Sequence, residues 1–221
     1  MALDIEVALR LPIAGILLPK VEGPQQVHAL DAAITGSAAP GGAPRILPMI
    51  ETAAGLINVR DIARSAPGRI ETLILGTADL ATDLGLTLSP DERELAPYRA
   101  EIVVAARAAG LPGPVDGPEL NLGATDFAET CERSARAGFS GRVCLTPGQA
   151  SEAGRAYTEV APAELHRLLE VVEVFEAMQT DGLTVARIDG VFVDPPVYRQ
   201  ARRALHRHFA FAKHHTDTKG H

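Results

Sequence analysis

Two acidic residues of this sequence each follow a short apolar run. Glu51 directly follows residues 46–50, and Asp79 stands four residues after the run at 72–75. If the two runs are neighbouring parallel strands, their carboxyl ends meet at one edge of the sheet and the two acids converge there. Like charges that close would raise the pKa of one acid, and a divalent cation removes the repulsion. Because Mg²⁺ takes one or two carboxylates and leaves positions for water and substrate oxygens, the pair predicts a magnesium site.

Each acid by itself also has a structural interpretation. Glu51 could be a negative charge near the N-terminus of the following helix, where the helix dipole favours it. Asp79 could cap the helix that continues from Leu80. The joint position of the two acids at strand ends favours the metal site, whereas Asp83, one helical turn further on, is interpreted as structural.

A turn of small residues and one lysine stand near these acids. Gly76, Thr77 and Ala78 lie between the strand and Asp79, where free backbone N–H groups can bind an anion such as a substrate carboxylate. Lys20 ends another apolar run, and the sequence favours a solvated or structural lysine over a catalytic one there.

Strands and helices alternate along the chain, and these elements must position the acids. Continuous apolar runs, typical of parallel strands covered on both faces, occupy residues 15–18, 46–50, 72–75, 113–115 and 142–145. Stretches with helical apolar spacing lie between and after them. This alternation predicts repeated βα units and an α/β fold.

The C-terminal part follows a different pattern. Residues 185–194 favour a small hairpin that turns at Asp189-Gly190, and a helix is expected from Pro196 to about residue 209. We expect a partial barrel domain over residues 1–212, with this hairpin and helix from about residue 185. Residues 213–221 are polar and lack periodicity, which predicts a disordered tail with solvated histidines.

The composition argues against several classes of protein. The 221 residues are 46% hydrophobic and 22% charged, as in ordinary globular proteins. A formal net charge of −7 argues against binding to nucleic acid or to an anionic membrane. No apolar stretch approaches the ~20 residues that span a bilayer, and the acid-bearing N-terminus favours a helix over a signal peptide. We therefore expect a cytoplasmic protein in which Cys131 and Cys144 are free thiols.

Six segments of the sequence have a characteristic order. They are AGILLPKVEGPQQV, LPMIETAAGLINVRDIA, LILGTADLATDLG, VVAARAAGLPGPVDG, AGFSGRVCLTPGQA and DGVFVDPPVYRQARRAL. Together, and in this order, they resemble one known family, the citrate lyase beta-subunit-like proteins of the HpcH/HpaI aldolase group. The resemblance covers about residues 5–206. It implies a TIM-type (β/α) barrel of the phosphoenolpyruvate/pyruvate superfamily, assembled as a homo-oligomer (a trimer or larger).

The same resemblance implies a reaction. Members use Mg²⁺ to cleave or form a carbon–carbon bond in CoA thioesters of hydroxy acids, of the malyl-, citramalyl- or citryl-CoA type. The implied partners are therefore a CoA thioester and a small keto acid. Cleavage is a retro-Claisen reaction in which a base removes the hydroxyl proton and a thioester enolate is released. That enolate needs a positive or hydrogen-bonding partner.

The family's functional residues can be carried over by motif. Glu51 and Asp79 resemble the two metal ligands of the family. Gly76, Thr77 and Ala78 resemble the turn whose amides hold the keto-acid carboxylate.

Asp194 in VFVDPP resembles a family aspartate that reaches the active site of a neighbouring subunit and acts there as the acid/base. An aspartate before Pro195-Pro196 and a helix is equally typical of a helix cap. The sequence leaves both interpretations open.

The sequence departs from the family pattern in three respects. A complete barrel has eight strands, whereas five are found here, so we expect an N-terminally truncated barrel of about five of the eight βα units. The missing strands would carry a family arginine for the thioester, and Thr146 stands where relatives often have histidine. Two alternatives to a CoA-ester lyase therefore stay open. One is a class II pyruvate-type aldolase without CoA, and the other is a catalytically inactive paralogue or subunit of a split enzyme.

Overall fold

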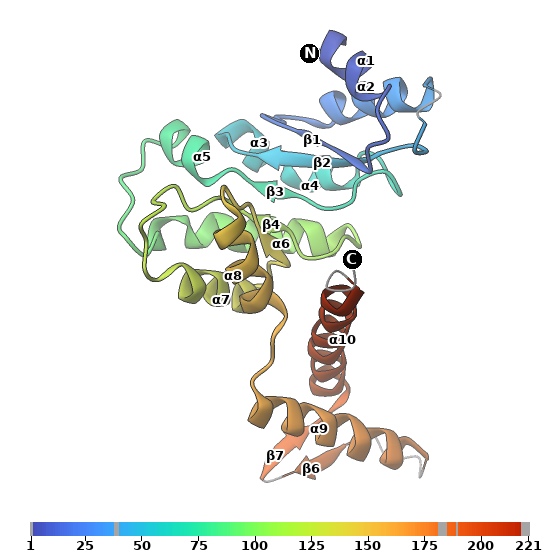
Figure 1. Ribbon diagram of the computed structural model, residues 1–221, viewed down its shortest axis with the longest axis vertical. Helices are drawn as coiled ribbons and strands as arrows, with labels where there is room; N and C mark the ends of the chain where they lie inside the picture. Colours follow the sequence, from blue (N-terminus) through green and yellow to red (C-terminus); the bar gives the residue numbers. More distant parts are fainter. Residues whose placement is uncertain (1, 38–39, 181–184, 189, 218–221) are drawn as a thin grey trace. The chain divides into compact units, whose positions relative to one another are not determined.

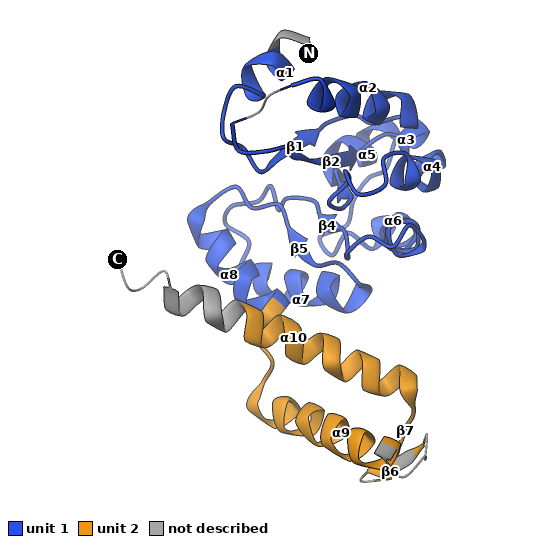
Figure 2. Ribbon diagram, turned by 90° about the vertical axis from the view of Figure 1, so that its right-hand side faces the viewer, with its two compact units in different colours: residues 1–157 blue, residues 158–221 orange. Residues whose placement is uncertain are grey.

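The computed structural model describes residues 2–37, 40–180, 185–188 and 190–217, in two compact units (Figures 1 and 2). The first unit spans Met1–Tyr157 and the second spans Thr158–His221. Each unit has its own hydrophobic core. The domain expected over residues 1–212 thus comprises the first unit and most of the second.

Five parallel strands form the sheet of the first unit, and strands that follow one another in the sequence are neighbours in the sheet. They are β1 (Gly15–Leu18), β2 (Arg45–Ile50), β3 (Ile74–Leu75), β4 (Val115–Asp116) and β5 (Gly141–Arg142). Each strand expected from the sequence overlaps one of these, although the last three are only two residues long. The predicted α/β class is confirmed.

Helices precede, connect and follow these strands (Figure 1). They are α1 (Ala2–Ala8), α2 (Pro24–Thr35), α3 (Ala53–Ile57), α4 (Val59–Arg64), α5 (Thr77–Asp83), the 3₁₀ helix η1 (Arg93–Leu95), α6 (Ala96–Ala108), α7 (Phe127–Ala137) and α8 (Pro147–Thr158). Local sequence sets several of their ends. The Thr52 hydroxyl accepts a 3.1 Å hydrogen bond from the Gly55 N–H at the start of α3. Gly138 ends α7 at φ +107°, a backbone conformation that favours glycine.

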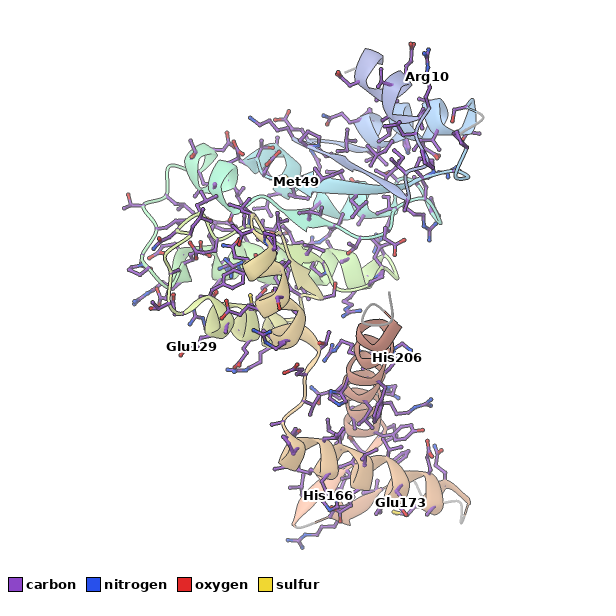
Figure 3. All side chains as sticks on the ribbon, in the orientation of Figure 1. Arg10, Met49, Glu129, His166, Glu173 and His206 are labelled. Atoms are coloured by element: carbon purple, nitrogen blue, oxygen red, sulfur yellow. The ribbon has the colours of Figure 1, made fainter. Side chains whose placement is uncertain are left out.

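The core of the first unit lies between the sheet and these helices. Ile46 and Ile50 of β2 and Ile62 of α4 are fully buried in it. In β2 these buried residues alternate with half-buried ones, such as Met49, which Figure 3 labels. The expectation that both strand faces are buried is therefore wrong for β2.

The second unit is a helical pair with a hairpin. Its elements are α9 (Pro162–Thr180), β6 (Ala186–Ile188), β7 (Val191–Val193) and α10 (Pro195–Asp217). The predicted hairpin is confirmed, because β6 and β7 pair antiparallel. Asp189 of its predicted turn lies outside the described residues, and Gly190 has φ +81°. Phe175 of α9 stacks on Tyr198 of α10 with 4.6 Å between ring centroids.

Helix α10, on which Figure 3 labels His206, is longer than the sequence predicts. It continues to Asp217, so residues 213–217 are helical where a disordered tail is expected, and residues 218–221 lie outside the described part. The reason is local, because after Pro196 no proline or glycine occurs before Gly220 to end the helix. Within the described residues, no helix has both the length and the apolar character that a membrane crossing requires.

The core position of Ile46 gives a stability prediction. Ile46→Ala should lower the free energy of unfolding by about 2–5 kcal/mol, because Ile46 is fully buried. The matched substitution Ile57→Ala should change it by less than about 0.5 kcal/mol, because Ile57 is 81% exposed. Urea denaturation of both variants measures this difference, and equal effects would contradict the described packing.

Candidate functional site

The strand register brings the two acid-bearing segments together. In the pairing of β2 with β3, Ile50 is opposite Leu75. Glu51 directly follows β2 and Gly76 directly follows β3. These two residues therefore lie side by side at the carboxyl edge of the sheet. A Cβ atom added to Gly76 would lie 2.5 Å from both Cβ and Oε2 of Glu51, so only glycine leaves space for the acid. Helix α5 begins at the next residue and carries Asp79 in its first turn.

Glu51 is almost completely buried, with 4% of its surface exposed. Its Oε1 atom accepts a 2.8 Å hydrogen bond from the Lys20 N–H. Burial raises the pKa of the Glu51 carboxyl above its usual value, and the Lys20 N–H opposes this increase. The negative charge of Asp79 raises the pKa further. The two acids are thus close enough to interact, as their positions in the sequence predict.

Lys20 contacts both acids. In addition to the backbone contact with Glu51, its Nζ atom lies 3.7 Å from Oδ1 of Asp79. The side chains of this ion pair are 65% and 57% exposed, so water screens the attraction and the pair adds little stability. The sequence favours a solvated or structural lysine here, and the exposed side chain agrees with this interpretation. The structure adds that its charge lies beside the acid pair.

The turn before Asp79 is fixed by close packing. Thr77 is buried, and the backbone of Gly117 approaches its side chain so closely that any Cβ on Gly117 would overlap it. The first N–H groups of a helix have no partner within it, so those of Thr77, Ala78 and Asp79 are donors at the same sheet edge. The three predicted turn residues and the two acids therefore lie together.

A third acid at a strand end, Asp116, belongs to a structural network instead. It ends β4 and is fully buried. Its carboxylate accepts hydrogen bonds from Arg99 Nε (3.2 Å), Ser134 Oγ (2.7 Å) and the Gly117 N–H (2.9 Å). Because these donors occupy its oxygens, Asp116 is not a metal ligand in this arrangement, although its position in the sequence is similar to that of Glu51.

Two further residues near the strand ends have structural contacts. Oδ2 of Asp83 accepts a 2.7 Å hydrogen bond from the Ala53 N–H, which links the end of α5 to the start of α3. The structural interpretation of Asp83 is confirmed by this contact. Thr146, which replaces the histidine of relatives, accepts a 3.1 Å hydrogen bond from the Gln149 N–H and caps α8.

Asp194 lies in the second unit, at the start of α10. Its Oδ1 atom accepts a 3.0 Å hydrogen bond from the Val197 N–H, so Asp194 is a helix cap. This contact agrees with one of the two interpretations that the sequence leaves open. The catalytic role of Asp194 stays a prediction.

The donor set at the sheet edge suits a small, hard cation. Glu51 and Asp79 supply carboxylate oxygens, and burial together with mutual repulsion disfavours the charge on Glu51 when no cation is bound. Within the described residues, no cluster of three or more His, Cys, Asp or Glu side chains could hold a metal ion. Two carboxylates are too few for a structural zinc site, but they suffice for Mg²⁺, which keeps several water or substrate ligands.

Comparisons with known proteins identify relatives of the whole chain. The family model HpcH/HpaI aldolase/citrate lyase matches residues 1–147. Citrate lyase subunit beta of Leuconostoc mesenteroides subsp. cremoris is 30% identical over 222 residues, which cover 98% of this chain and 72% of the relative. A (3S)-malyl-CoA thioesterase of Cereibacter sphaeroides is 30% identical over 210 residues, which cover 95% of this chain and 70% of the relative.

A solved structure has the same fold. CitE of Mycobacterium tuberculosis, in complex with magnesium, acetoacetate and coenzyme A, superposes with a TM-score of 0.73 at 26% sequence identity. The match covers 94% of this chain and 73% of that chain. The predicted TIM-type barrel of the phosphoenolpyruvate/pyruvate superfamily is confirmed by these matches.

The raised pKa of Glu51 predicts a pH-dependent effect on stability. A carboxyl whose pKa is raised in the folded state favours folding at low pH, and this contribution is lost as the pH rises through the folded pKa. Glu51→Gln removes the buried charge and keeps an acceptor for the Lys20 N–H. Without divalent metal, the variant should therefore melt at a higher temperature than the wild type at neutral pH, and the difference should shrink towards about pH 4.

Thermal melts in EDTA at the two pH values measure this effect. Glu132→Gln, at an exposed acid of α7, is the control and should show no comparable dependence. A Glu51→Gln protein that is less stable than the wild type at neutral pH would contradict the described environment of the acid.

Proposed function

Because the chain belongs to the HpcH/HpaI aldolase/citrate lyase family, we propose that it is a magnesium-dependent carbon–carbon lyase acting on a CoA thioester of a hydroxy acid. The observation that carries the proposal is that buried Glu51 and Asp79 both lie at the carboxyl edge of the sheet, where Lys20 contacts each of them. The relatives support the substrate class, since they include a citrate lyase subunit, a malyl-CoA thioesterase and a structure with magnesium and coenzyme A.

Glu51 and Asp79 are the proposed metal ligands. The Lys20 N–H and the backbone of Gly76 fix the position of the Glu51 carboxylate, and the first turn of α5 holds Asp79. When bound, Mg²⁺ would neutralise the acid pair and polarise the oxygens of the hydroxy acid.

Gly76, Thr77 and Ala78 are proposed to bind the carboxylate of the keto acid. The N–H groups at the start of α5 are hydrogen-bond donors beside the acid pair, and the helix dipole adds a partial positive charge. The packing of Thr77 against Gly117 supports the proposal, because it fixes the turn before substrate arrives.

Asp194 is the proposed acid/base, supplied by a neighbouring copy in a homo-oligomer (a trimer or larger). The proposal rests on the family resemblance of VFVDPP. It is compatible with the observed helix cap, because the hydrogen bond from the Val197 N–H engages Oδ1 and leaves Oδ2 for proton transfer.

The proposed metal ligands can be tested directly. Glu51→Gln and Asp79→Asn should each lower kcat for cleavage of malyl-CoA by about 100-fold or more, because each removes one of two ligand charges. Magnesium binding, measured by calorimetry, should weaken in parallel. Asp61→Asn, at an exposed acid of α4, is the control and should leave both unchanged.

The products of this assay separate the alternatives. A keto acid together with an acyl-CoA indicates lyase chemistry, whereas free CoA with the intact hydroxy acid indicates hydrolysis. Cleavage of hydroxy-keto acids without CoA would favour the pyruvate-type aldolase, and magnesium binding without turnover would favour the inactive paralogue or split subunit. Thioester cleavage that is indifferent to both Glu51→Gln and Asp79→Asn would contradict the proposal.

Asp194 has a test that separates catalysis from capping. Asparagine caps helices about as well as aspartate but cannot transfer a proton, so Asp194→Asn should keep the melting temperature while lowering kcat strongly. Asp194→Ala should lower kcat and also destabilise the protein by about 1 kcal/mol. If Asp194→Asn keeps full activity, Asp194 is a helix cap only.

A further inference from the structure

Lys20 has a backbone conformation that its residue type disfavours. Its φ is +48°, in the left-handed region where the Cβ of an L-residue is crowded and glycine is favoured. The conformation is held on both sides. The Lys20 N–H donates to Oε1 of Glu51 at 2.8 Å, and its carbonyl accepts a 3.0 Å hydrogen bond from Nε2 of Gln26. A disfavoured backbone conformation that hydrogen bonds hold in place is typical of functional sites. Here, this conformation directs the Lys20 side chain to the acid pair.

The charge of Lys20 is available to a ligand. At 3.7 Å from Oδ1 of Asp79, its Nζ atom is beyond hydrogen-bond distance, so its N–H donors are not committed to that acid. Both side chains are more than half exposed, and an exposed pair of this kind contributes little to stability. A substrate oxygen that binds next to Asp79 would therefore lie within reach of the ammonium group.

The charges at this edge favour such a role. Glu51 and Asp79 together carry two negative charges, which a divalent cation balances. Among the cationic side chains in the described part of the chain, Lys20 is the one that pairs with Asp79. With a divalent cation bound, the charges of Glu51, Asp79, the cation and Lys20 add up to one positive charge. A net positive charge attracts an anionic substrate.

We propose that the Lys20 ammonium group contacts the substrate and stabilises the negative charge that develops on it during cleavage, an inference that rests on the proposed function. In that reaction, the bond between the hydroxyl-bearing carbon and the α-carbon of the thioester breaks. The hydroxyl proton passes to the base, and the electron pair of the broken bond moves onto the thioester as an enolate, which then takes up a proton. The enolate oxygen needs a hydrogen-bond donor or a positive charge. Glu51 and Asp79 cannot supply either, whereas Lys20 supplies both.

Side-chain variants of the full-length protein test this role. Lys20→Met keeps the length of the side chain and removes the charge, while the backbone contact with Glu51 remains possible. We expect kcat for malyl-CoA to fall about 100-fold, with KM and the magnesium Kd changed by less than about threefold, because the charge acts on a state formed only during the reaction. Lys20→Arg should recover part of the lost kcat, since it restores the positive charge.

Two further variants control for structure. Lys20→Gly should fold at least as well as the wild type, because glycine suits φ +48°, and its kcat should fall as in Lys20→Met. Arg60→Met removes an exposed cation of α4 that pairs with Glu101, and it should leave the kinetics unchanged.

The outcomes separate this inference from the proposed function. A Lys20→Met protein whose kcat stays within about threefold of the wild type would overturn the inference alone. The same holds if the loss of kcat is matched by an equal loss of magnesium affinity, because Lys20 would then only position the two acids. A wild-type chain that binds no magnesium, or cleaves no thioester, would contradict the proposed function and the inference together.

Discussion

The buried carboxylate of Glu51 is the constraint on which the rest of the site depends. A charged acid with 4% of its surface exposed is unfavourable unless its surroundings compensate. Among the described residues, the Lys20 N–H donates a hydrogen bond to this carboxylate and the Lys20 charge favours it, but burial and the negative charge of Asp79 outweigh both and raise its pKa. The compensation is therefore incomplete within the protein. A bound cation would complete it, which gives the site a physical reason to bind metal.

Close backbone approaches keep this arrangement in place. The Glu51 side chain lies against Gly76, and the Thr77 side chain lies against Gly117, so the ends of three neighbouring strands contact one another through glycine. Larger residues at Gly76 or Gly117 would separate these strand ends. The same contacts put Glu51 and the first turn of α5 beside each other, so the sheet itself sets the geometry of the two acids.

Asp116 shows how an acid at a strand end becomes structural. Like Glu51 it is buried at the carboxyl end of a strand, but Arg99, Ser134 and the Gly117 N–H satisfy its oxygens. Glu51 instead accepts a hydrogen bond from the Lys20 N–H, and the neighbouring charge of Asp79 is negative. The number of hydrogen-bond donors and the charge of the neighbouring groups therefore distinguish a structural acid from a candidate metal ligand. The position at the end of a strand does not.

The sequence by itself determined the strands, the C-terminal hairpin and the two acids at the sheet edge, because apolar periodicity and turn residues act over short distances along the chain. Its family motifs also indicated the barrel. Only the tertiary structure decided the environments of Lys20 and Asp116. The Lys20 N–H contacts Glu51 across 31 residues, and Asp116 contacts Arg99 and Ser134 across 17 and 18 residues. No local pattern encodes such contacts, because they depend on which strands become neighbours.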